Sequence, residues 1–194
     1  MAGGAAELGR RGLAVTLKSS PLIPRDVANK LARDVESVAL PILNFSPSFT
    51  DEDLIDIVRL GGPVRQVAIA KRPRISDQVT STIVKEGVEE AVKTVCANDN
   101  ASFSDLTYSQ CLQRFEKSEQ VLAAIAYRSV LPMGVTEKLI DMVSDQIRDH
   151  LLTNHAVSPE TALMIAMGAK ERATIDLVDQ AGRTADVKAF VAHL

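Results

Sequence analysis

The chain has 194 residues, of which 46% are hydrophobic and only 4% aromatic, with no tryptophan. A core of Val, Ile, Leu and Ala suits closely packed helices better than a β-sandwich. The formal net charge of −3 provides no overall field that would draw nucleic acid or an anionic membrane to the chain. Two cysteines make no disulfide framework, which favours a reducing cytoplasm.

Residues 1–20 are rich in Ala and Gly and contain three basic residues. They have no long apolar run that could serve as the core of a signal peptide, so we expect a flexible N-terminal arm. No stretch of the chain approaches the roughly 18 to 20 apolar residues that cross a bilayer, so no membrane span is expected.

The first predicted helix begins at Pro24, because proline fits the first turn of a helix. Its expected end or kink lies near Pro41, and residues 46–48 form a turn. Apolar residues at spacings of three and four give this helix one buried face: Val27, Leu31, Val35, Val38, Ala39 and Ile42.

The next predicted helix opens at Thr50, followed by three carboxylates that suit the positive end of a helix dipole. Residues 61–63, Gly-Gly-Pro, end it. A short helix over 64–71 follows and is stopped by Pro73. The hydroxyl of Ser76 then caps a helix that is closed at Gly87.

Further helices are predicted over 88–98, from Ser104, over 118–128, over 135–152 and from Ser158, with a last short one over 186–193. No segment alternates apolar and polar residues strictly enough to indicate a strand. The expected fold class is therefore all-α.

The chain repeats part of its own sequence. Residues 68–72, Ala-Ile-Ala-Lys-Arg, return as residues 124–128, Ala-Ile-Ala-Tyr-Arg. Such a repeat in a helical sequence indicates an α-solenoid of stacked antiparallel helices, since one unit cannot bury its apolar face alone. We expect repeat copies near 34–84 and 88–140, a degraded third from about 150, and one repeat domain over 21–194.

Several segments resemble an uncharacterised bacterial family, domain of unknown function 2336. The resemblance covers roughly residues 24–152, and it implies a HEAT-like helical repeat and no particular activity. It is carried by Leu31-Ala32-Arg33-Asp34, Val38-Ala39-Leu40-Pro41-Ile42-Leu43, Ser46-Pro47, Asp53-Leu54-Ile55, Ala68-Ile69-Ala70-Lys71-Arg72, Asn98 with Ala101, and Arg128 with Leu131-Pro132.

Arg72 and Arg128 end equivalent helices, and two interpretations of them stay open. In the favoured one, each guanidinium binds the C-terminal carbonyls of a helix. In the other, Arg72 joins Lys71 and Arg74 in an anion site, with Arg128 as a further member, because a guanidinium suits phosphate or carboxylate. The second copy replaces Lys71 with Tyr127, so the cluster itself is not repeated.

The remaining motifs favour structural roles. The repeated pairs Asn44 with Asn98 and Phe49 with Phe103 suit helix ends and the residues before caps. His150 and His155 are five residues apart, whereas a metal pair on one helix face needs three or four. Cys96 and Cys111 read as small buried hydrophobes.

No catalytic constellation is recognisable, so no enzyme activity, metal or cofactor is predicted. We expect a non-catalytic protein-interaction scaffold or regulatory module that binds a protein partner in its groove. The alternative is a sensor of a nucleotide or other anionic small ligand through Lys71, Arg72, Arg74 and Arg128. Nucleic acid is disfavoured by the net charge, and a homodimer is a further expectation.

Overall fold

The protein is all-α in the computed structural model, which describes residues 2–168, with side chains from residue 5 onward. One isolated parallel β-bridge, between Ile75 and Ala101, is the only strand-like pairing in that range. The helices are α1 (Ala2–Leu17), α2 (Arg25–Ala32), α3 (Glu36–Phe45), α4 (Asp51–Leu60), α5 (Gly62–Ala70), α6 (Asp77–Glu86), α7 (Glu89–Cys96), α8 (Asp105–Arg114), α9 (Glu119–Ala126), α10 (Met133–Ile140), α11 (Asp145–Asn154) and one over 159–168.

The chain divides into two compact units, Met1–His155 and Ala156–Leu194. This differs from the single domain predicted over 21–194. The first unit holds α1 to α11, and the helix over 159–168 belongs to the second. The predicted helix over 186–193 lies outside the described residues.

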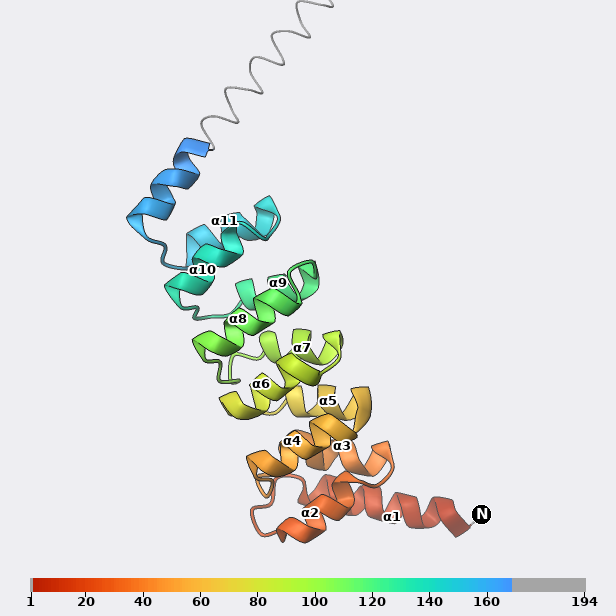
Figure 1. The fold of residues 1–194 in the computed structure, drawn as a ribbon. Coiled ribbons are helices and arrows are strands. Elements are labelled where there is room, and N and C mark those ends of the chain that lie inside the picture. Colours follow the sequence, from red (N-terminus) through yellow and green to blue (C-terminus); the bar gives the residue numbers. More distant parts are fainter. Residues whose placement is uncertain (1, 169–194) are drawn as a thin grey trace, which may run out of the picture. The chain divides into compact units, whose positions relative to one another are not determined.

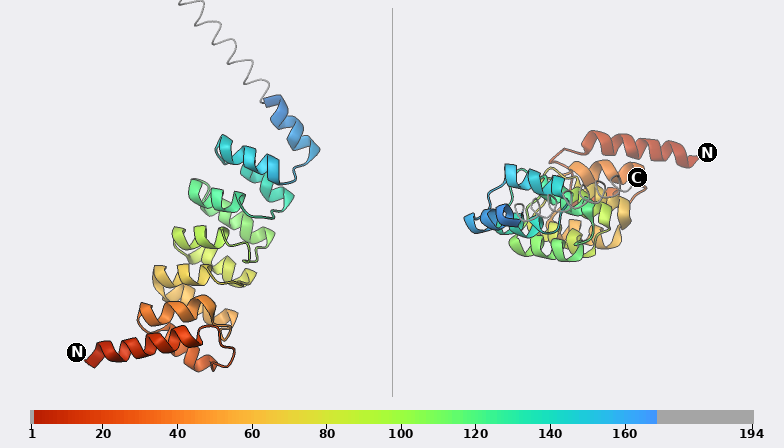
Figure 2. Two further views of the ribbon diagram at one scale, coloured as in Figure 1. Left: turned by 180° about the vertical axis from the view of Figure 1, so that it is seen from behind. Right: turned by 90° about the horizontal axis from the view of Figure 1, so that it is seen from above.

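Helices of the first unit stack in two layers, because each helix except α2 packs on the helix two places along the chain, whereas α2 packs on α3 (Figure 1). The odd-numbered helices α1 to α11 form one layer and α4, α6, α8 and α10 the other, as the view from behind also shows (Figure 2). The core between them consists of fully buried aliphatic side chains, among them Val38, Ile42, Val58, Ile69, Ile83, Val92, Ile125 and Leu139.

Four of the predicted helix starts are confirmed by their side-chain caps. Thr50 and Asp53 form a reciprocal capping box at the start of α4. Ser76, Ser104 and Ser118 each accept a hydrogen bond from the backbone N–H three residues later. These caps satisfy amides that have no partner within their own helices, which fixes where each helix begins.

The N-terminal segment differs from the predicted flexible arm, since α1 is a helix packed on α3. Ala14 is fully buried, and Arg10 Nε lies 2.7 Å from Asp34 Oδ2. The Ala-rich sequence provides the small side chains that allow α1 to lie close to its neighbour.

Two predicted long helices are each two helices in the structure. The first breaks between Ala32 and Glu36 and then continues through Pro41 without the expected end. Arg65 from α5 binds the carbonyls of Ala32 and Asp34, so a distant arginine completes the end of α2. The helix predicted over 135–152 breaks likewise between α10 and α11, where Arg148 Nε binds the Ile140 carbonyl. Apolar periodicity continues across both breaks because the two helices face the same core.

Candidate functional site: the corner between α4 and α5

Arg72, a member of the predicted basic cluster, is buried with 7% of its surface exposed. Its Nη1 and Nη2 donate to the carbonyls of Leu43 and Ser46, at the end of α3. Its guanidinium carbon lies 5.7 Å from the ring centroid of Phe49. Burial lowers the pKa of Arg72 from its usual value, with Asp51 opposing that effect.

Arg128 occupies the equivalent position two helix pairs further on, and it is also 7% exposed. Its Nη1 donates to the carbonyls of Cys96 and Asn98, both at 2.9 Å, and its Nη2 donates to that of Ala101 at 3.0 Å. The guanidinium is therefore engaged with the end of α7 and the loop after it, as the structural interpretation of this residue predicts.

After α7 and α11, other residues make the same contact. Asn98, after α7, donates to the carbonyls of Ala70 and Arg72 at 3.0 and 2.8 Å. His155, after α11, places Nε2 3.2 Å from the Ala126 carbonyl. The helices α5, α7, α9 and α11 are thus each followed by a polar residue that binds the end of the previous odd-numbered helix. Along the stack, arginine at this position alternates with asparagine or histidine. The sequence repeat therefore spans two helix pairs.

The four predicted site residues therefore do not share one open cluster. Arg72 and Arg128 are buried on helix ends, whereas Lys71 and Arg74 are exposed. Among the other predicted residues, Cys96 and Cys111 are fully buried, with their Sγ atoms 3.6 Å apart. No group of three or more His, Cys, Asp or Glu that could hold a metal ion occurs in residues 2–168.

A tight corner joins α4 directly to α5 through Gly61 and Gly62. Gly62 has φ +76°, a left-handed conformation that suits glycine. A Cβ on Gly61 would lie 2.5 Å from the Ile57 carbonyl oxygen and 2.9 Å from Arg65 Cδ. The corner therefore requires glycine, and the absence of a side chain lets Arg65 lie across it toward α2.

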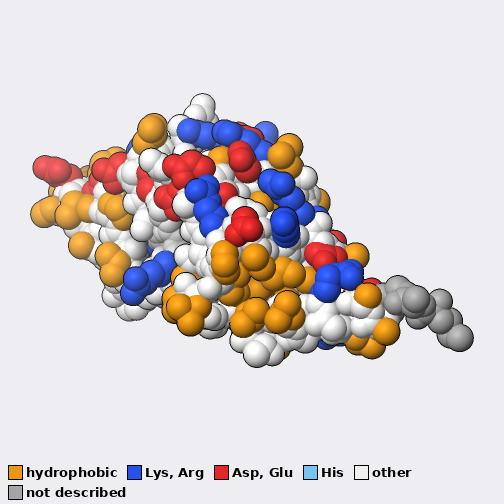
Figure 3. Space-filling model, turned by 90° about the horizontal axis from the view of Figure 1, so that it is seen from below, with side chains coloured by type: hydrophobic (Ala, Val, Ile, Leu, Met, Phe, Trp, Pro, Cys, Tyr) orange, Lys and Arg blue, Asp and Glu red, His pale blue; other side chains and the backbone are white. Residues whose placement is uncertain are grey.

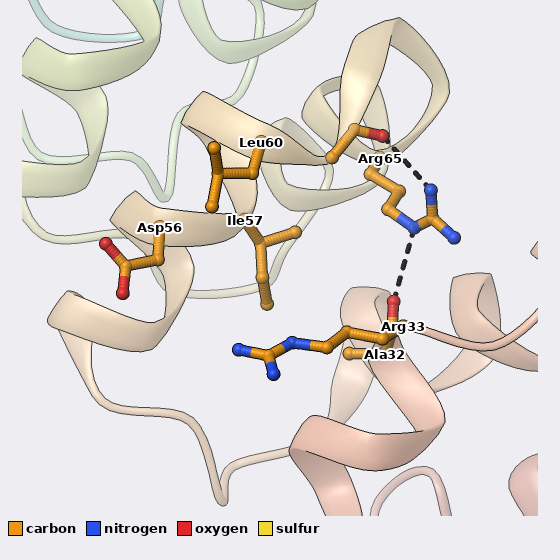
Figure 4. Close-up of a pocket in the computed structure, with 7 residues that line it drawn as sticks. Ala32, Arg33, Asp56, Ile57, Leu60 and Arg65 are labelled. Atoms are coloured by element: carbon orange, nitrogen blue, oxygen red, sulfur yellow. Dashed lines mark hydrogen bonds between the residues drawn. The ribbon is translucent and has the colours of Figure 1, made fainter.

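Two hollows flank this corner. The first, of about 270 Å³, lies toward α2 (Figure 4) and is lined by Ala32, Arg33, Asp56, Ile57, Leu60, Gly61 and Arg65. The second, of about 370 Å³, lies toward α3 and α7 and is lined by Leu40, Asn44, Pro63, Val64, Val67, Ala68, Lys71, Val88 and Glu90. Asn44 Oδ1 in the second hollow is buried and has no hydrogen-bond partner among the described residues.

Exposed apolar side chains lie at the corners where an even-numbered helix leads into the next odd-numbered helix. We call this set the corner stripe: Val35, Leu60, Val64 and Val88, which are 47%, 86%, 44% and 36% exposed. The equivalent corner between α8 and α9 carries the exposed, charged Glu116 and Lys117 instead. The stripe is therefore a feature of the corners before α3, α5 and α7.

A second apolar surface lies at the N-terminal end of the first unit. Figure 3 shows hydrophobic side chains gathered on this end face, with charged side chains around them. The large exposed hydrophobic residues of α1 and of the segment that follows it are Leu8, Leu13, Val15 and Leu22.

The sequence interpretation missed Arg33, Asp56 and Leu60. Each looks like an ordinary surface residue of an amphipathic helix. The sequence does not indicate that the end of α2 lies beside α4, because the packing of the stack brings them together. One sequence signal of this corner was present: the Gly-Gly-Pro run over 61–63 indicates a tight turn between two helices.

The comparisons with known proteins identify a family only. A family model described as an uncharacterised protein conserved in bacteria, DUF2336, matches residues 38–194. No curated protein and no solved structure matches the chain. No helix in the described part of the chain is long and apolar enough to cross a membrane.

Proposed function

The chain belongs to the bacterial DUF2336 family, and we propose that this member is a non-catalytic protein-interaction module built as a HEAT-like α-solenoid. The stacking of helices on their second neighbours supports the solenoid. In such an array each pair contacts only its neighbours, so the corners form an extended surface along the stack.

The corner stripe is the observation that carries this proposal. Leu60 is 86% exposed although Ile57 and Val58, three and two residues before it on α4, are buried. Single exposed apolar residues are ordinary, but exposed apolar residues at three successive corners, three of them lining two hollows, favour an interaction site. Burying these side chains against a partner would remove apolar surface from water.

The chemistry of the hollows indicates the partner. Both have apolar floors, and both carry charges of the two signs: Arg33, Arg65 and Asp56 in the first, Lys71 and Glu90 in the second. Charge complementarity then favours a protein segment with apolar side chains flanked by charges of both signs. Such a segment would lie along the stripe as an amphipathic helix or an extended chain.

The sensor of an anionic ligand has less support, because Arg72 and Arg128 are already engaged with carbonyls and only Lys71 and Arg74 remain exposed. It stays a prediction. The homodimer also stays a prediction, and the apolar end face of α1 offers a surface for it.

The experiment is quantitative affinity capture from the source bacterium with the full chain as bait. Leu60→Glu and Val64→Glu should each remove a partner that the unaltered chain retains. Leu106→Glu is the matched control, because Leu106 is 65% exposed on α8 and does not line either hollow. Equal capture by all three variants would reject the corner stripe as the binding surface.

A further inference from the structure

The hollow toward α2 is lined by two exposed charged side chains, Arg33 and Asp56, that have no partner within the described part of the chain. Neither Arg33 nor Asp56 makes a side-chain hydrogen bond or ion pair in residues 2–168. Neighbouring arginines behave differently: Arg25 pairs with Asp53 at 2.7 Å and Arg59 with Glu86 at 3.1 Å. Two arginines and a carboxylate thus line one hollow, and because Arg65 is engaged with backbone carbonyls, Arg33 and Asp56 are the two that retain their hydrogen-bonding capacity.

The wall of this hollow is fixed by the fold. Arg65 donates from Nε to the Ala32 carbonyl at 3.2 Å, from Nη1 to that of Gly61 at 3.2 Å and from Nη2 to that of Asp34 at 2.7 Å. Its guanidinium is held by both sides of the corner and is not free to swing into the hollow. The shape is therefore present before any ligand arrives, which lowers the cost of binding.

The floor is apolar, and the charges lie beside it. Ile57 is buried, whereas Leu60 extends into solvent above the hollow. In Figure 4 the Arg33 side chain reaches past Ile57 toward the side on which the Asp56 carboxylate lies. One small molecule could therefore contact both charges and the apolar floor together.

We propose that this hollow binds a free α-amino acid with an apolar side chain. The ligand carboxylate accepts hydrogen bonds from the Arg33 guanidinium, and the ligand ammonium donates to Asp56. The aliphatic side chain packs on Ile57 and Leu60. This assignment does not rest on the protein-interaction role and can be tested without a partner.

Other ligand classes fit these groups less well. A simple anion would meet Asp56 as a like charge, and a simple cation would meet Arg33 in the same way. A neutral apolar ligand would remove water from both charges and return no hydrogen bond to either. A zwitterion on an apolar side chain satisfies the cation, the carboxylate and the floor at once.

The test is a titration of the methyl-labelled full chain with L-leucine to about 10 mM, which detects the weak affinity expected of two partly exposed ion pairs. The methyl signals of Ile57 and Leu60 should shift and saturate. Arg33→Gln and Asp56→Asn should each weaken binding about fivefold. The controls Arg74→Gln and Glu116→Gln remove exposed charges elsewhere and should leave the affinity unchanged.

Two analogues separate the ligand groups. N-acetyl-L-leucine lacks the ammonium and L-leucinamide lacks the carboxylate, so both should bind about fivefold more weakly than L-leucine. Equal binding of N-acetyl-L-leucine, which resembles the C-terminal residue of a peptide, would overturn the amino-acid assignment. Absence of any saturable shift, or an equal loss in the control variants, would overturn it too.

Discussion

The guanidinium of Arg128 lies over the ring of Phe103, with 4.8 Å between its central carbon and the ring centroid. The same side chain binds three backbone carbonyls at the end of α7 and in the loop that follows. Arg72 and Phe49 repeat the relationship two helix pairs earlier. A repeated guanidinium that completes a helix end and stacks on an aromatic ring joins one helix pair of the stack to the previous pair.

Replacing Arg128 with alanine should destabilise the fold by about 3 kcal/mol, because three carbonyl acceptors lose their donors in a buried joint. Urea unfolding of the full chain measures this change. Arg74→Ala is the control and should stay within about 0.5 kcal/mol of the unaltered chain, since Arg74 is exposed. Equal stability of the two variants would mean that Arg128 does not hold the joint.

Glycine at position 61 should resist substitution. Gly61→Ala places a Cβ 2.5 Å from a backbone carbonyl oxygen, which forces the corner to shift and should cost about 2 kcal/mol. Gly134→Ala in α10 meets nothing within 4 Å and should raise the stability by about 0.5 kcal/mol. Thermal unfolding of both variants checks the contrast, and a tolerated Gly61→Ala would argue against the tight corner.

Stability should fall in acid partly through Asp53. The hydrogen bond from Arg25 holds the pKa of Asp53 well below its usual range, and the Thr50 amide and Asn29 add to this effect. A carboxyl with a lowered pKa in the folded state stabilises the protein above its unfolded pKa of about 3.9, and this contribution is lost as the pH falls below that value. The stability gap between the unaltered chain and Asp53→Asn should therefore narrow from pH 7 to pH 3. A gap that stays constant would show that the Asp53 charge does not contribute.

The two thiols should be unreactive in the native protein. The hydrogen bond with Cys111 and burial both raise the pKa of Cys96, so little thiolate is present. A chromogenic disulfide reagent should label Cys96 and Cys111 only as fast as the chain opens, and faster in urea. Val130→Cys, at a position that is 78% exposed, should react at once and serves as the control. Immediate reaction of the native thiols would contradict their burial.

Much of the fold could be predicted from local signals. The caps at Thr50, Ser76, Ser104 and Ser118 depend on nearby side chains and mark helix starts correctly. The breaks after α2 and α10 could not be predicted, because arginines from elsewhere in the stack or the next helix complete those ends. The packing of α1 likewise depends on a distant partner, Asp34, which no local pattern reveals.

The candidate site was less accessible to sequence reasoning. The sequence repeat drew attention to Arg72 and Arg128. These two residues hold neighbouring helix pairs together. The corner stripe lies where the two copies of the sequence repeat differ. In the sequence, the exposed Leu60 resembles any other surface leucine. Only the stacking of α2, α4 and α5 shows that Arg33 and Asp56 line one hollow.

Site-specific photo-crosslinking in living cells tests the interaction surface most directly. A photoreactive residue placed at position 60, 64 or 88 should link to one discrete protein, and one placed at position 106 should not. Adding Val35→Glu, which leaves the crosslinking position intact, should reduce the product formed from position 60. Crosslinking of the same protein from position 106 as efficiently as from position 60, or no product at any stripe position, would contradict a partner bound along the corner stripe.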